Sequence, residues 1–185
     1  MNDQRTYAAF AGERLIAAGE LRHMLLETKA ELDRGGVGDV LIFEDQTGRQ
    51  VDFDFRGSAE DVVERALPPR RSGPGRPRLG VVSREVSLLP RHWEWLEEQP
   101  NGISAALRRL VEEGKKREPA AERARRARDA AGRFMSAMAG NLPGYEEASR
   151  ALYAGYAARF GELIRDWPAD VREHAAKLAE ASFAG

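Results

Sequence analysis

A proline- and glycine-rich stretch near the middle of the chain limits the fold more than any other feature of the sequence. Residues 68–80 read PPRRSGPGRPRLG and contain four prolines, three glycines and four arginines. Proline removes a backbone N–H donor and glycine favours no regular conformation, so neither a helix nor a strand continues through this segment. The sequence therefore predicts a linker and a domain boundary here, with residues 1–67 expected to fold as a unit of their own.

Residues 1–67, before the linker, are predicted to form a small acidic α+β head. Four stretches with apolar or alternating patterns predict strands joined as two hairpins, at residues 7–10, 14–18, 40–43 and 50–55. Helical spacing over residues 20–33 predicts a helix, and Ser58 with Asp61 resembles a capping box that opens a second helix. The head contains eight Lys and Arg against 14 Asp and Glu, a net charge of −6.

Residues 81–117, after the linker, predict one strand followed by two helices. The strand is the alternating run VVSREVSLL, and Pro90 occupies a favoured first position of a helix that extends to about Gln99. A tight turn at Pro100–Asn101–Gly102 precedes a second helix, which Ser104 is expected to cap. A lone strand leaves its backbone groups unpaired, so we expect this strand to pair with its copy in a homodimer.

This strand-helix-helix order resembles the ribbon-helix-helix family of DNA-binding proteins. The resemblance is carried by the strand, by the Leu-Pro that opens PRHWEWLEEQ, and by the second-helix stretch ISAALRRLVEEG. In that family two strands form an antiparallel ribbon that enters the major groove, and N–H groups at the start of the second helix grip a phosphate. The resemblance implies that Asn101, Gly102 and Ser104 lie at a DNA phosphate, with Arg108 and Arg109 near the dimer surface or the DNA backbone.

The predicted strand has two faces, and neither is typical of a base-reading ribbon. Because successive side chains alternate, the outward set is either Ser83, Glu85 and Ser87, or Arg84 together with two apolar residues. Phosphates repel Glu85 unless its carboxylate accepts a hydrogen bond from a cytosine amine. Three interpretations of the segment stay open: a DNA-reading ribbon, a related copy used only for dimerisation, or an unrelated strand-helix-helix piece.

The linker places positive charge next to this unit. Residues 68–91 contain six arginines and one acid, Glu85, a net charge of +5. The linker arginines, which would release counterions from DNA, are Arg70, Arg71, Arg76 and Arg78. Gly75-Arg76-Pro77 also resembles the centre of an AT-hook, although Pro74 stands where that motif has arginine. The alternative is a basic linker that binds no nucleic acid.

Residues 118–185 predict an alanine-rich helical tail. One helix is expected over residues 120–138, a second over residues 145–167, and a third that begins at Pro168. The second helix carries a stripe of aromatic and leucine side chains at helical spacing. We interpret the stripe as core packing between helices, with a groove for a ligand or partner as the alternative.

The order of acidic head, GRPRLGVVSREVSLLPRHWEWLEEQPNGISAALRRLVEE core and aromatic-alanine tail resembles the bacterial domain-of-unknown-function family numbered 2239. The resemblance covers nearly the full length, and it implies fold boundaries but no activity. The expected fold class is therefore α+β and helix-rich. Its parts are a head at residues 1–67, a linker at 68–80, a ribbon-helix-helix-like unit at 81–117 and a tail at 118–185.

Composition and motifs point away from several classes of chemistry. The chain has no cysteine, its three histidines fall in separate predicted helices, and neither a GxxxxGK[ST] nor a GxSxG motif occurs. No apolar run approaches the ~20 residues of a membrane span, and the N-terminus lacks a signal-peptide pattern. Glu44, Asp45, Asp52 and Asp54 could bind Mg²⁺ along a hairpin, with a solvated acidic strand face as the alternative. We therefore expect a cytoplasmic, non-enzymatic protein without a metal, a cofactor or a membrane partner.

The leading functional hypothesis is a homodimeric DNA-binding protein, with transcriptional regulation as one such role and any small-molecule effector left open. The residues expected to contact DNA are Arg70, Arg71, Arg76, Arg78, Ser83, Arg84, Glu85, Ser87, Asn101, Gly102, Ser104 and Arg108. One alternative is a protein-interaction or assembly module that dimerises without DNA. The other is an enzyme of unrecognised type.

Overall fold

A computed structural model describes residues 5–67, 84–116 and 119–183. The fold class is α+β and helix-rich, as predicted. The chain divides into two compact units, of which the first joins residues 1–69 to residues 120–185 and the second comprises residues 70–119.

The first unit is built around a four-stranded antiparallel sheet with the order β2-β1-β3-β4. Its strands are β1 (Thr6–Ala11), β2 (Arg14–Glu20), β3 (Val40–Glu44) and β4 (Arg49–Val51). The two predicted hairpins are both present. In the centre of the sheet, Tyr7 of β1 lies opposite Gly19 of β2 and Glu44 of β3.

The fourth strand ends after Val51, earlier than the strand predicted over residues 50–55. The carboxylate of Asp54 accepts hydrogen bonds from both the backbone N–H and the guanidinium of Arg56. Such local side-chain bonds compete with the ladder of a sheet and hold the chain in a turn. The two phenylalanines of this segment nevertheless stay half-buried against the apolar cluster on that side of the sheet.

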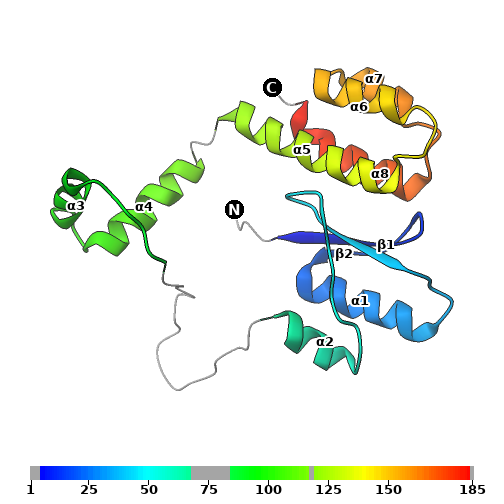
Figure 1. The fold of residues 1–185 in the computed structure, drawn as a ribbon, viewed down its shortest axis with the longest axis horizontal. Helices are drawn as coiled ribbons and strands as arrows, with labels where there is room; N and C mark the ends of the chain where they lie inside the picture. Colours follow the sequence, from blue (N-terminus) through cyan, green and yellow to red (C-terminus); the bar gives the residue numbers. More distant parts are fainter. Residues whose placement is uncertain (1–4, 68–83, 117–118, 184–185) are drawn as a thin grey trace. The chain divides into compact units, whose positions relative to one another are not determined.

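Helices cover both faces of the sheet, so the first unit has three layers (Figure 1). One face is covered by α1 (Leu21–Arg34) and α2 (Ala59–Ala66). The other is covered by α5 (Ala120–Met138) and α8 (Ala169–Ala179). Beyond them, α6 (Tyr145–Ala154) packs on α5, α7 (Ala157–Leu163) packs on α6, and a 3-10 turn, η1 (Glu180–Ser182), follows α8.

The central strand β1 explains why both faces need a cover. Tyr7 and Ala9 belong to the core shared with α1 and α2, whereas Ala8 and Phe10 belong to the core shared with α5 and α8. All four are buried, and a strand buried on both faces shows a continuous apolar run instead of an alternation. The head's sheet therefore depends on the tail's helices, and the expectation that residues 1–67 fold as a unit of their own is wrong.

The single helix predicted over residues 145–167 is two helices, because the chain turns at Gly155. Gly155 has φ 76°, and its N–H donates to the carbonyl of Leu152 while the N–H of Tyr156 donates to that of Ala151. Left-handed glycine with these bonds is a common end of a helix. Tyr156 is consequently 66% exposed, although most of the predicted stripe is buried or half-buried.

The second unit contains two helices in its described part, α3 (Pro90–Glu97) and α4 (Ile103–Lys116), close to the two predicted helices. Residues 84–89 form no strand, and residues 81–83 of the predicted strand lie outside the described residues. A strand is defined by its pairing with a neighbour, and a single chain offers this segment none. The paired ribbon therefore stays a prediction.

Candidate nucleic-acid interface

Helices α3 and α4 form a hairpin with a very small core. Among the residues described in this unit, the buried apolar side chains are Leu96, 3% exposed, and Ala106, 2% exposed. Arg109 braces the hairpin, because its guanidinium donates to Gln99 Oε1 at 3.1 Å and Gln99 in turn donates to the carbonyl of Trp95. Small domains bury too little apolar surface to be stable alone, so this hairpin needs additional cover.

The same unit leaves large apolar side chains in water. They are Val86 (55% exposed), Leu89 (49%), Trp95 (46%), Leu110 (39%) and Val111 (59%). Trp95 and Leu110, together with Leu107, line a groove of about 240 Å³. Trp93 is half-buried, so the two neighbouring tryptophans have different surroundings. An apolar surface of this kind marks a binding site in a soluble protein.

The residues predicted to contact DNA fall into two groups. Seven are described, and all seven are exposed: Arg84, Glu85, Ser87, Asn101, Gly102, Ser104 and Arg108. The other five, Arg70, Arg71, Arg76, Arg78 and Ser83, lie outside the described residues. The structure brings Asn101, Gly102 and Ser104 together at the start of α4, with Arg108 one turn further along that helix. Arg84, Glu85 and Ser87 lie in the segment before α3.

The start of α4 differs from the prediction in one respect. The helix begins at Ile103, so Gly102 occupies the capping position and the prediction that Ser104 caps the helix is wrong. Asn101 and Gly102 adopt left-handed φ angles of 71° and 79°, which asparagine and glycine accommodate best. No acidic side chain lies in the first turn of α4, so the positive end of its dipole is not neutralised from within the helix.

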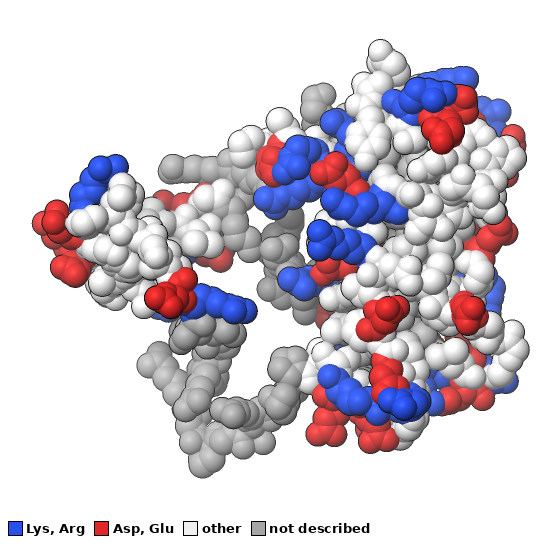
Figure 2. Space-filling model, viewed as in Figure 1, with Lys and Arg blue, Asp and Glu red and all other residues white. Residues whose placement is uncertain are grey.

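The charges of the hairpin are balanced. Residues 84–116 contain six Lys and Arg and six Asp and Glu. Both signs appear on the visible face of α3 and α4 in Figure 2, and Arg109 approaches Glu113 at 4.0 Å. The excess of positive charge that phosphates require must therefore come from the arginines of residues 68–80.

A second polar cluster, inside the first unit, joins the head to the tail. Asp45, in the turn after β3, accepts hydrogen bonds from Lys177 Nζ at 3.0 Å and from Thr6 Oγ1 at 2.9 Å. His174 Nε2 lies 3.3 Å from the other carboxylate oxygen, an ion-pair contact that is not aligned as a hydrogen bond. The imidazole packs edge-on against Phe10 and a second phenylalanine of the core.

This cluster is placed to stabilise the fold and not to bind a substrate. The side chains of Asp45 and His174 are only 7% and 3% exposed. Burial alone would raise the pKa of Asp45, but the contacts with His174 and Lys177 outweigh it and lower the pKa to about 2. The carboxylate is therefore ionised and already occupied by partners from α8.

We expect Asp45→Asn to lower the free energy of unfolding by about 2 kcal/mol at neutral pH, because the amide cannot compensate the charge of Lys177. The pKa of Asp45 lies below its ordinary value of 3.8 in the folded chain, so its contribution is complete above pH 3.8 and disappears as the pH falls toward 2. Denaturant titrations at both ends of this range measure the difference.

The matched control for this prediction is Asp39→Asn, which makes the same change at an exposed position. It should leave the free energy of unfolding nearly unchanged at every pH. A cost of Asp45→Asn that is the same at pH 5 and pH 2 would contradict an ionic role for the carboxylate.

The other acidic and histidine residues do not gather into a site. Within the described residues, no group of three or more His, Cys, Asp or Glu side chains is arranged to hold a metal ion. Asp54, one of the residues considered for Mg²⁺, is paired with Arg56 at 2.8 Å, and that hydrogen bond lowers its pKa. The described helices also include none with the length and apolar character needed to cross a membrane.

Comparison with known proteins gives one match. A family model described as "Uncharacterized protein conserved in bacteria (DUF2239)" matches residues 6–179. The match covers both ends of the first unit and all described residues of the second. No curated protein and no solved structure matches the chain.

Proposed function

The chain belongs to the DUF2239 family, and we propose that it is a homodimeric DNA-binding protein. In this proposal residues 81–117 of two chains pair through their strands and resemble a ribbon-helix-helix dimer. The observation that carries the proposal is the apolar surface of the second unit, on which Val86, Trp95 and Val111 are all about half exposed. Regulation of transcription is one role that such a dimer would serve.

A second copy of the same unit suits this surface. Val86 and Leu89 precede α3, whereas Trp95 and Leu110 lie on the walls of the groove. The segment before α3 of one chain can therefore cover the helices of the other, and the reverse contact follows by twofold symmetry. The same pairing would satisfy backbone groups that residues 84–89 leave outside any strand.

DNA is the proposed partner because of the linker arginines and the start of α4. Arg76 and Arg78 would supply diffuse positive charge, and the N–H groups after Gly102 would meet a phosphate. Such contacts position a protein on DNA without reading sequence. Any reading of bases would come from the segment that holds Arg84 and Glu85. The proposal needs no cofactor and no catalytic residue, and it implies a location in the cytoplasm.

A protein-interaction or assembly module that dimerises without DNA is the second candidate. The equal numbers of acidic and basic residues over 84–116 favour it, as does the exposed Glu85 in the segment that would approach phosphates. Both candidates share the dimer and differ in the role of the linker arginines.

The mass of the full chain in solution tests the element that both candidates share. Sedimentation equilibrium at micromolar concentration should give twice the mass of one chain. A stable monomer at that concentration would exclude both candidates. A dimer that binds no DNA at low salt would select the assembly module.

We expect Glu85→Gln to tighten binding to DNA of any sequence by about fivefold, which corresponds to roughly 1 kcal/mol of repulsion removed. Fluorescence anisotropy with two unrelated duplexes measures the effect. Glu60→Gln, at an exposed position of the first unit, is the matched control and should leave both affinities unchanged. Weaker binding restricted to one duplex would instead show that Glu85 accepts a hydrogen bond from a cytosine. No change on either duplex would place Glu85 away from DNA.

A further inference from the structure

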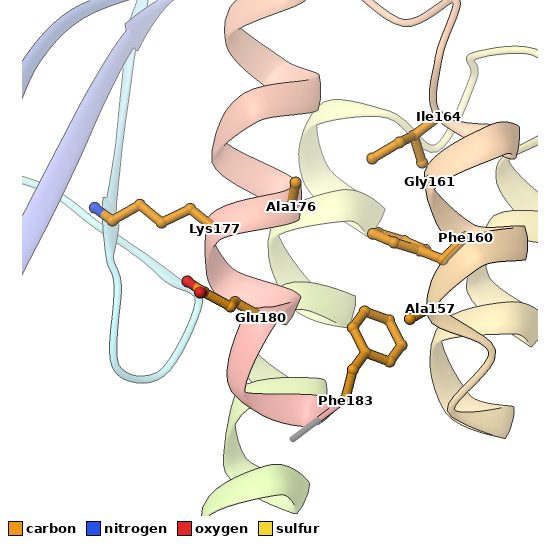
Figure 3. A pocket seen from close by; sticks show the side chains of 8 residues that line it. All are labelled: Ala157, Phe160, Gly161, Ile164, Ala176, Lys177, Glu180 and Phe183. Atoms are coloured by element: carbon orange, nitrogen blue, oxygen red, sulfur yellow. The ribbon is translucent and has the colours of Figure 1, made fainter. Parts of the chain in front are cut away.

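The apolar groove between α7 and α8 is not used by the proposed function. It lies in the first unit and has a volume of about 390 Å³ (Figure 3), within the range of small-molecule sites. Phe160 and Ile164 of α7 form one wall, and Ala176 and Phe183 form the other.

The surface of the groove is made of carbon atoms. The rings of Phe160 and Phe183 lie 5.6 Å apart at an angle of 46°. Lys177 and Glu180 also border the groove, but their charged ends point away from it in Figure 3. The amine of Lys177 is held by Asp45 at 3.0 Å. A molecule in the groove would therefore meet no charged group, and its buried part must be apolar.

Gly161 is the observation that points to an occupant. This glycine lies within α7, where glycine destabilises a helix relative to alanine. Its φ angle is not left-handed, and a Cβ added to it would meet no atom within 4 Å. Neither the backbone nor the packing of the chain thus requires glycine here. Its absent side chain keeps the groove open and exposes the α7 backbone to whatever enters.

We propose that this groove binds a small apolar molecule that carries a ring. The ring lies against Phe160 and Phe183, whose tilted faces favour aromatic contact, and approaches the bare backbone at Gly161. A partner helix is a poorer fit, because α7 has only seven residues, about two turns, to receive it. The site is independent of residues 84–116 and so does not rest on the proposed dimer.

The test is a fluorescence titration of the full chain with N-phenyl-1-naphthylamine, an uncharged probe that brightens when it leaves water. The probe should bind saturably at this groove. Gly161→Leu combined with Ala176→Leu fills the groove from both walls and should weaken that binding at least about tenfold. Leucine is also a better helix former than glycine, so the melting temperature should not fall.

Two control variants locate the probe. Ala158→Leu adds the same side chain at an exposed position of α7 outside the groove and should leave binding unchanged. Leu110→Glu alters the groove of the second unit and should also leave this site intact. The proposal is overturned if the double variant binds the probe as tightly as the natural chain, or if Leu110→Glu alone abolishes all binding.

Discussion

Leu110→Glu is expected to convert the homodimer into a monomer at micromolar concentration. Leu110 is 39% exposed in one chain and lines the groove of the second unit together with Trp95 and Leu107. Pairing would bury it, and a carboxylate in that position would lose its hydration without gaining a partner. Because both copies carry the change, the dissociation constant of the dimer should rise at least about 100-fold. Sedimentation velocity over a concentration series measures this constant.

Gly114→Glu is the matched control for this prediction. It adds the same charge to α4 at an exposed glycine, where a Cβ would meet no atom within 4 Å. Glutamate forms helix well, so both variants should keep their helical circular dichroism. A Leu110→Glu chain that remains dimeric would show that the second unit is not the dimer interface.

Arg76→Ala combined with Arg78→Ala is expected to weaken binding to every DNA sequence. A dimer would lose four arginines, and the slope of log K against log salt should fall by about one for each phosphate contact removed. Both arginines lie outside the described residues, so the expectation rests on the sequence of the linker. Titrations of two unrelated duplexes over a series of salt concentrations give the slope.

The control for the linker variant removes the same charge elsewhere. Arg150→Ala with Arg159→Ala changes two exposed arginines of the first unit that pair with Glu147 and Glu162 on their own helices. It should lower the affinity much less and keep the salt slope. An unchanged slope in the linker variant would show that these arginines make no phosphate contact.

Elements specified by neighbouring residues could be predicted from the sequence. Ser58 and Asp61 form the predicted capping box, in which each side chain bonds the backbone of the other. The turn between β1 and β2 contains Gly12 with φ 58°, and α5 spans the residues expected of it. In each case the controlling contacts lie within a few positions along the chain, so the pattern is visible without tertiary structure.

Contacts between distant residues could not be predicted. Lys177 lies 132 positions from Asp45, and no local spacing indicates that they meet. The continuous apolar run of β1 was an overlooked indication, because it is typical of a strand covered on both faces. The groove at Gly161 likewise depends on how α7 and α8 pack. The candidate DNA residues are predictable only as exposed positions, since their arrangement would depend on a second chain.

The central claim is that a dimer of this chain binds DNA through its linker arginines and second unit. Its most direct test is a titration of duplex DNA with the full chain at about 50 mM and about 200 mM salt, with the mass of the complex measured at both. The account predicts two chains per bound duplex site and an affinity that falls at least about 100-fold at the higher salt. Absence of binding at the lower salt, or equal affinity at both, would contradict it.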